Sequence, residues 1–376
     1  MLGFAWQQGF ADVAPVSARM TGAEARVSRT GQDVVTPNEH ALVILEDGAV
    51  PFCHYENPHF HAAAEPRWMA PGLLAGIIRR ARKDKIALTF LLGKTAPPPK
   101  LQHLIDTVDH AKIVPWELHG RYPDAVVVLD AKDSISFAEL TNNLDRNLIL
   151  RLGKRSLKKC SGLVEALFGK FRRLSIHLVD VEDFTSSDFV SYEKELRKMR
   201  AALVPFYRDG YPVEVNVLTD RMMLSAMRNC GAGVDHLTIA PDGKCYLCPA
   251  FYYDDERSSV GAFDDKKGLV VRRLAAAQFV RAPLCTRCDA FHCKRCIFLN
   301  KKTTLELNVP SEQQCAVAHL EREASRQMLI DLGSTEPFRR MPRITELNYR
   351  DPLECIDAPP LGVQLRATDP STDPML

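Results

Sequence analysis

Cysteines are concentrated in one part of this 376-residue chain, and their spacing is the strongest chemical signal in the sequence. Eight of the eleven cysteines fall between Cys230 and Cys315. They include three Cys-x2-Cys pairs, a spacing that places two thiolates on one tight loop and suits a soft metal. Eight thiols suffice for two four-coordinate sites. The candidate metal ligands are Cys230, Cys245, Cys248, Cys285, Cys288, Cys293, Cys296 and Cys315.

The spacing alone leaves the metal open, because four thiolates bind either a zinc ion or an iron–sulfur cluster. The N-terminus shows no secretory signal pattern, so we expect a cytoplasmic protein, in which thiols stay reduced. Cysteine clusters in that compartment bind metal or do chemistry more often than they form disulfides. Two structural zinc sites and two iron–sulfur clusters are therefore the competing interpretations.

A second group of possible ligands lies far upstream, in the segment that follows a predicted strand at 41–47. Imidazole, thiolate and carboxylate groups together could make a mononuclear or dinuclear iron or zinc site. Barrel enzymes place their chemistry at the C-terminal ends of their strands. The alternative is that these are surface histidines in a polar loop. The members of the group are Cys53, His54, Glu56, His59 and His61, of which Cys53, His54, His59 and His61 are candidate catalytic residues.

Other polar residues follow later predicted strands. Asp220 and Arg221 come after an apolar run, and Asp220 is a further catalytic candidate, with the alternative that it caps the helix "RMMLSAMRN". Three further acids could line the same end of the predicted barrel or could be solvated loop residues: Asp180, Glu182 and Asp183. A basic patch could offset cluster charge or dock a peptide, and it comprises Lys294, Arg295, Lys301 and Lys302. Single histidines such as His236 and His319 are more often packing residues than ligands.

Composition excludes some partners. Lys and Arg (49) nearly balance Asp and Glu (47), so bulk charge favours neither nucleic acid nor a membrane surface. The apolar runs are too short to span a bilayer. The expectation is a protein that binds neither.

Strands and helices must alternate to position these residues. Strand–helix alternation with apolar runs indicates parallel pairing, and six or seven such units indicate a full or partial (β/α) barrel. Predicted strands cover 41–47, 86–93, 125–130, 148–153, 174–180 and 212–220. Predicted helices cover 71–84, 99–110, 157–171 and 186–208.

The pattern changes after Cys230. "HLTIAPDGKCYLC" has alternating residues around a Pro-Asp-Gly turn and predicts a hairpin. A helix at 311–330 follows the Cys-rich stretch, with Ser311 as its N-cap. We therefore expect a barrel over 39–229 and a small Cys-rich domain over 230–330. Residues 1–38 are expected to be a flexible leader and 331–376 a Pro-rich tail.

The Cys-rich segment resembles a SPASM domain, the C-terminal extension of radical SAM peptide-modifying enzymes. Seven cysteines match that pattern in order, Gly243 falls in the hairpin turn, and the spacing within 285–296 is slightly compressed. The resemblance implies two 4Fe–4S clusters. One would be held by Cys285, Cys288, Cys293 and Cys315. The other would be held by Cys230, Cys248 and Cys296, with a fourth position that Cys245 could fill unless it is a small core residue.

A narrower resemblance covers residues 40–330 approximately. Sequence segments that include "TVDHAKIVP", "CPAFYY" and "CKRCIFLNKKTTLELNVPSEQQC" resemble sequences of the CXXX repeat peptide maturase family. This resemblance implies a radical-SAM-type barrel that matures a ribosomally made, Cys-rich precursor peptide. It also allows for partner maturation proteins. The protein would then be a peptide-modifying oxidoreductase or maturase.

One radical SAM motif is absent. The usual Cys-x3-Cys-x2-Cys binds the cluster that holds S-adenosylmethionine, whereas the segment after 41–47 has only Cys53. This absence speaks against the use of S-adenosylmethionine. The auxiliary clusters could serve the reaction directly, for instance through an open iron that binds a substrate thiolate. The alternative function is a non-catalytic peptide-recognition partner with structural zinc sites.

Overall fold

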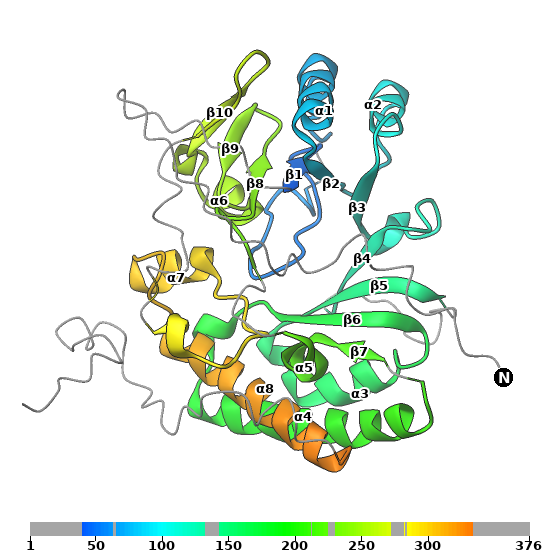
Figure 1. The fold of residues 1–376 in the computed structure, drawn as a ribbon, viewed down its shortest axis with the longest axis vertical. Helices are drawn as coiled ribbons and strands as arrows, with labels where there is room; N and C mark the ends of the chain where they lie inside the picture. The colour runs from blue at the N-terminus through cyan, green and yellow to red at the C-terminus, as the bar shows by residue number, and fades with distance from the viewer. Residues whose placement is uncertain are drawn as a thin grey trace, which may run out of the picture.

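One continuous sheet organises the chain (Figure 1). In this computed structural model the described residues are 40–62, 65–131, 143–211, 213–224, 230–271, 282 and 284–333. Their eleven strands lie in the order β11-β10-β9-β8-β1-β2-β3-β4-β5-β6-β7. The strands are β1 (His40–Ile44), β2 (Ala87–Leu91), β3 (His110–Pro115), β4 (Val126–Asp130), β5 (Asn143–Leu152), β6 (Phe171–Leu178), β7 (Glu214–Val215), β8 (His236–Ile239), β9 (Lys244–Tyr246), β10 (Gly261–Asp264) and β11 (Gly268–Val271).

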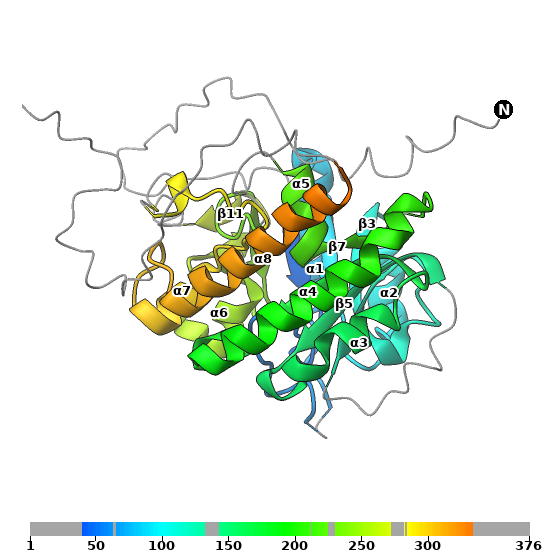
Figure 2. The same ribbon diagram turned by 90° about the horizontal axis from the view of Figure 1, so that it is seen from below.

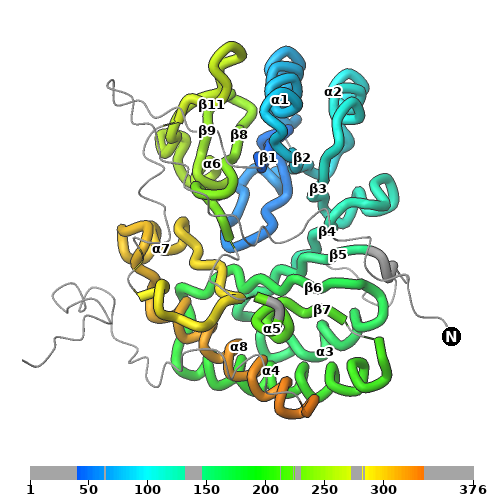
Figure 3. The backbone as a smooth tube through the Cα atoms, in the orientation of Figure 1, coloured from blue at the N-terminus to red at the C-terminus, as the bar shows by residue number. Residues whose placement is uncertain are grey.

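The strands from β8 through β1 to β7 are all parallel to their neighbours, which confirms the expected α/β class with a large parallel sheet. Their apolar runs are buried on both faces, as parallel strands require, and include Val43, Phe90 and Leu150. In the described part of the chain β7 and β11 form the two edges, so the sheet is a partial barrel. Figure 3 shows the backbone bending from the β1–β4 half to the β5–β7 half.

The long helices begin and end where the sequence predicts. Helix α1 spans Pro71–Asp84, with Pro at its first turn, and α4 spans Ser186–Arg208. Helix α8 spans Glu312–Asp331, and Ser311 caps it by accepting a hydrogen bond from the Gln314 backbone amide at 3.3 Å. Figure 2 shows α4 and α8 lying across one side of the molecule.

Other predicted elements are shorter in the structure. Helix α2 (Pro99–Ile105) ends early because the chain turns into β3. The predicted helix at 157–171 becomes a 3-10 turn and α3 (Cys160–Glu165), since β6 already starts at Phe171. The remaining helices are α5 (Arg221–Met223), α6 (Pro249–Asp254) and α7 (Ile297–Thr304).

The predicted strand at 212–220 is wrong beyond Val215. Strand β7 has two residues and leads into a turn of π-helix, Asn216–Asp220. The reason is that the Asn216 side chain replaces the backbone ladder on β6. Its amide donates to the Ile176 carbonyl at 2.9 Å, and its oxygen accepts from the Ile176 amide at 2.7 Å.

The predicted hairpin is present as β8 and β9, with Gly243 at φ +79° in its turn. It does not stand apart from the barrel half, because β8 pairs in parallel with β1, His40 opposite His236. Residues 230–271 therefore extend the same sheet, and strands β10 and β11 continue it in antiparallel fashion.

Parts of the sequence-based picture lie outside the described residues, namely the leader at 1–38 and nearly all of the tail at 331–376. Within the described residues, no helix is both long and apolar enough to cross a membrane.

Candidate metal centres

Four thiols meet at one cavity under the curved sheet. The cavity has a volume of about 340 Å³, and strands β1, β2, β3, β6 and β8 all contribute to its wall. Its floor includes the loop after β1 and the start of α7. The cysteines that line it are Cys53, Cys230, Cys248 and Cys296.

Four further thiols line a second, smaller cavity of about 30 Å³, between the Cys-rich loop and α8. They are Cys285, Cys288, Cys293 and Cys315. His319 lies against this group, with its Nε2 atom 3.5 Å from Cys288 Sγ. The structure thus brings together the set that the resemblance implies for one cluster. His319 contacts that set, although the sequence favoured a packing role.

Backbone amides point at several of these sulfurs. Ala290 N donates to Cys288 Sγ and Arg295 N donates to Cys293 Sγ, both at 3.4 Å. At the larger cavity Leu299 N donates to Cys296 Sγ at 3.5 Å. Hydrogen bonds to sulfur stabilise thiolate charge and tune iron–sulfur centres. These local turns suit sulfurs that carry negative charge.

Burial raises the pKa of Cys53, Cys248 and Cys296 at the larger cavity and of the four cysteines at the smaller one. The pKa rises to about 12 for Cys53, through burial and then the nearby Cys230 thiol, and to about 12 for Cys285, through burial and then Cys288. Burial also raises the pKa of Cys248 and Cys296, with neighbouring thiols as the next cause. Thiols with such pKa values are protonated at neutral pH, so binding a metal must displace their protons.

Cys245 is not brought to the other thiols. It lies on β9, is fully buried in the apolar core, and lines neither cavity. Burial raises its pKa to about 12, and the next cause is Asp242 rather than another cysteine. The structure places it as a small core residue.

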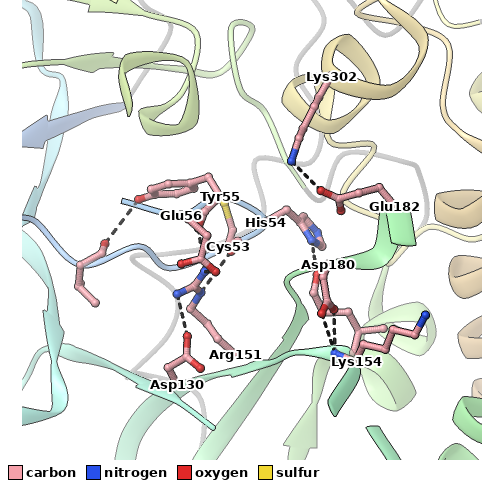
Figure 4. Close-up of polar contacts among 12 residues, drawn as sticks. Cys53, His54, Tyr55, Glu56, Asp130, Arg151, Lys154, Asp180, Glu182 and Lys302 are labelled. Carbon is pink, nitrogen blue, oxygen red and sulfur yellow. Dashed lines mark hydrogen bonds and ion pairs between the residues drawn. The ribbon is translucent and has the colours of Figure 1, made fainter. Parts of the chain in front are cut away.

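The loop after β1 is held by Arg151 on β5 (Figure 4). The guanidinium donates to the backbone oxygens of Tyr55 at 2.7 Å and Cys53 at 3.4 Å. It also pairs with Asp130 at 2.9 Å and Glu56 at 3.1 Å. Only 2% of its side chain is exposed. Arg151 therefore fixes the loop and directs Cys53 toward the larger cavity.

The loop histidines separate from each other. His54 lines the cavity, with Nδ1 2.7 Å from the Leu178 carbonyl and its ring 5.7 Å from that of His177. Burial lowers the pKa of both. His59 and His61 are exposed instead, and His61 Nδ1 lies 3.3 Å from Lys94 Nζ. The structure does not assemble Cys53, His59 and His61 into one site.

Asp220 forms a buried ion pair with Arg173. Its carboxylate accepts two hydrogen bonds from Arg173, at 2.7 and 2.8 Å, and its side chain makes no cap of α5. It lines neither of the two cavities. The neighbouring Arg221 is fully buried and pairs with Asp289 at 3.0 Å. Both side chains serve the packing of this region.

The other loop acids also have structural partners. Asp180 accepts from the Lys154 backbone amide at 2.9 Å, and Glu182 pairs with Lys302 at 2.7 Å (Figure 4). Of the predicted basic patch, Lys294 lines the larger cavity, whereas Lys301 donates to the Leu305 carbonyl. His236 lines the larger cavity as well.

In each of the two groups the thiols line a cavity and do not converge on a single atom position. Across the described ranges no three Cys, His, Asp or Glu side chains gather as ligands of a single metal ion would. The ten described cysteines form no disulfides. Four separated sulfurs around a cavity are compatible with a group larger than one ion.

Comparisons with known proteins inform the fold. No protein-family model matches the sequence, and neither does any curated protein. Among solved structures the chain is similar to a polyhistidine-tagged anSMEcpe with bound AdoMet, at 14% identity and a TM-score of 0.52, covering 81% of this chain and 100% of that one. It is also similar to native anSMEcpe with bound AdoMet and Cp18Cys peptide, at 14% identity and a TM-score of 0.52, covering 78% of this chain and 98% of that one. The chain therefore shares the fold of these anSMEcpe structures.

Proposed function

We propose that this protein matures a ribosomally synthesised Cys-repeat peptide, using iron–sulfur clusters held by the Cys-rich segment. The observation that carries the proposal is the gathering of seven matched cysteines into two groups, each at its own cavity. Thiolates in fours are the ligand set of 4Fe–4S clusters. Such clusters supply one-electron redox chemistry when bound.

The ligands of one cluster would be Cys285, Cys288, Cys293 and Cys315. Its surroundings support that assignment, since two backbone amides donate to sulfurs of the set. The other cluster would be held by Cys230, Cys248 and Cys296 at the larger cavity. Lys294 lines the same cavity and would offset part of the negative charge of the thiolates. The SPASM-type domain over 230–330 remains part of the proposal.

A peptide substrate is supported by the fold. Native anSMEcpe, a solved chain of the same fold, has AdoMet and Cp18Cys peptide bound. The larger cavity lies along the parallel sheet and is lined both by His40 and His236, at the starts of β1 and β8, and by Cys53 and His54, in the loop after β1. Polar groups from the chain, among them His54 and His177, face it and could orient a side chain that enters.

The proposal assigns no step to S-adenosylmethionine. Its usual cluster needs three cysteines on the loop after the first strand, and here that loop offers Cys53. Peptide modification should therefore proceed without cleavage of S-adenosylmethionine. Analysis of the reaction mixture for cleavage products after anaerobic incubation checks this part separately.

Coexpression tests the function. The chain would be produced with a precursor peptide that carries Cys at every fourth residue, and the peptide mass measured. We expect a mass change with the native chain and none with Cys288→Ala, whereas Cys160→Ala, a buried cysteine on α3 away from both cavities, should behave as native. An unmodified peptide in every case would contradict a maturase.

A zinc-stapled, non-catalytic peptide-recognition partner is the second candidate. The observation that favours it is the chemistry of the ligand set, since four thiolates such as those of Cys285, Cys288, Cys293 and Cys315 also make a structural zinc site. In that case the peptide would copurify with the chain unmodified. Zinc analysis of the native protein separates the two candidates.

A further inference from the structure

We propose that Cys53, the one cysteine of the loop after β1, is the fourth ligand of the metal centre formed by Cys230, Cys248 and Cys296. The inference rests on the proposed iron–sulfur function and adds a ligand that the SPASM resemblance leaves open. It joins the barrel half to the Cys-rich segment through one centre.

Geometry brings the four sulfurs together. Cys53, Cys230, Cys248 and Cys296 come from four separate segments, and all of them line the cavity of about 340 Å³. Three described segments of the fold make this possible. Strand β8 pairs in parallel with β1, and both strands line the cavity together with Cys230, from the segment before β8, and Cys53, from the loop after β1. Cys248 follows the hairpin, and Cys296 is the N-cap residue of α7.

Cys245 is the competing fourth ligand, and the structure argues against it. Its side chain is fully buried in the core on β9, and no other cysteine contributes to its pKa shift. Reaching the cavity would require the β8–β9 hairpin to change register, because Ile239 lies opposite Cys245. A one-residue slip would turn the apolar face of the hairpin outward.

The β1 loop is held in the position that ligation needs. Arg151 fixes the backbone oxygens of Cys53 and Tyr55, and Asn57 donates from its side-chain amide to the Asp47 and Ala49 carbonyls at 2.9 and 2.7 Å. A ligand on a fixed loop loses little conformational entropy on binding. Cys53 is therefore presented to the cavity before any metal arrives.

Single substitutions test the ligand. Cys53→Ala, Cys53→Ser and Cys245→Ala would be purified anaerobically beside the native protein, and iron, sulfide and EPR spectra recorded. We expect both Cys53 variants to lose at least one iron per chain and to gain the signal of a three-iron cluster, since three thiolates remain. Cys245→Ala should match native iron content and spectrum. The reverse pattern would assign the position to Cys245 and overturn the inference.

Alkylation of the native chain gives a test that needs no variant. The holo-protein would be labelled anaerobically with a thiol reagent, before and after iron chelation, and each cysteine quantified by mass spectrometry. We expect Cys53 to become reactive together with Cys230, Cys248 and Cys296 on chelation, and Cys245 to stay unreactive in both states. Equal labelling of Cys53 before and after chelation would overturn the inference.

The two failures are distinguishable. Native protein that carries zinc and no sulfide would refute the iron–sulfur function, whatever Cys53 does. Native protein that carries iron and sulfide, with Cys53 variants unchanged in both, would refute the ligand assignment and leave the function standing.

Discussion

Replacing Arg151 tests how the β1 loop is positioned. Arg151→Met keeps much of the volume of the side chain and removes its charge and all four of its contacts. The Asp130 carboxylate, with only 12% of its side chain exposed, would lose its ion pair with Arg151. Removing one member of a buried ion pair costs about 3–5 kcal/mol.

The size of the effect follows from the burial of each contact. Glu56 is 56% exposed, so its pair with Arg151 contributes less than about 1 kcal/mol. The carbonyl oxygens of Tyr55 and Cys53 lose a charged donor, which adds about 1–3 kcal/mol. Water reaching Asp130 offsets part of the sum, so we expect a loss of about 4 kcal/mol in the free energy of unfolding.

Urea denaturation of the metal-free chain, followed by circular dichroism, measures this loss. The matched control is Arg79→Met, which removes an ion pair with Asp265 whose side chains are 64% and 59% exposed. That control should cost less than about 1 kcal/mol. The Arg151 variant should also bind less iron, because Cys53 is no longer held. Equal stability of the two variants would refute the positioning role of Arg151.

Three other predictions follow from the described contacts. Asp220→Asn should lower the free energy of unfolding by about 2–4 kcal/mol in urea denaturation, because Arg173 loses one charged acceptor in a buried setting. The iron content of this variant should match that of the native chain. A loss of iron would contradict a packing role for Asp220. Burial raises the pKa of Glu46 to about 7, above its unfolded value, so its contribution to stability is lost as pH rises from about 5 through 7. Glu46→Gln, which keeps an acceptor for the Gly93 amide, should match the native chain near pH 5 and exceed its stability at pH 8; a constant difference would refute the shift. Burial raises the pKa of the Cys53, Cys248 and Cys285 thiols, so iron binding by the metal-free chain should strengthen from pH 6.5 to 8.5. Absorbance titration with iron under argon measures this dependence. Binding that does not change with pH would show that the thiols are already ionised.

Local patterns in the sequence predict much of the fold. Apolar runs identify the parallel strands, and periodicity with a proline at the first turn gives Pro71–Asp84 without error. The same approach fails at 216–220, because the Asn216 side chain replaces a backbone ladder, and an apolar pattern does not encode that exchange.

The sequence also predicts one of the two cysteine groups better than the other. Cys285, Cys288, Cys293 and Cys315 gather where spacing and resemblance predict, since three of them share one short loop. The approach of Cys53 to Cys230 could not be predicted, because 177 residues separate them along the chain. Both line one cavity beside β1 and β8, whose pairing is a long-range contact that leaves no periodic signal. One clue was present: Cys53 was the single thiol at the end of the first strand, and a fourth ligand was missing.

For the histidines of the β1 loop, the sequence predicted a grouping that the structure does not form. His59 and His61 have the spacing of metal ligands, but both are exposed while Cys53 faces the cavity. Sequence proximity over nine residues does not decide which side of a loop each side chain takes, because irregular backbone has no fixed period.

Anaerobic purification with iron, acid-labile sulfide and zinc quantified together tests the central claim most directly. Two four-iron clusters on eight thiols, Cys53 among them, predict about eight iron and eight sulfide per chain, with little zinc. A protein that instead carries zinc without acid-labile sulfide would contradict the account.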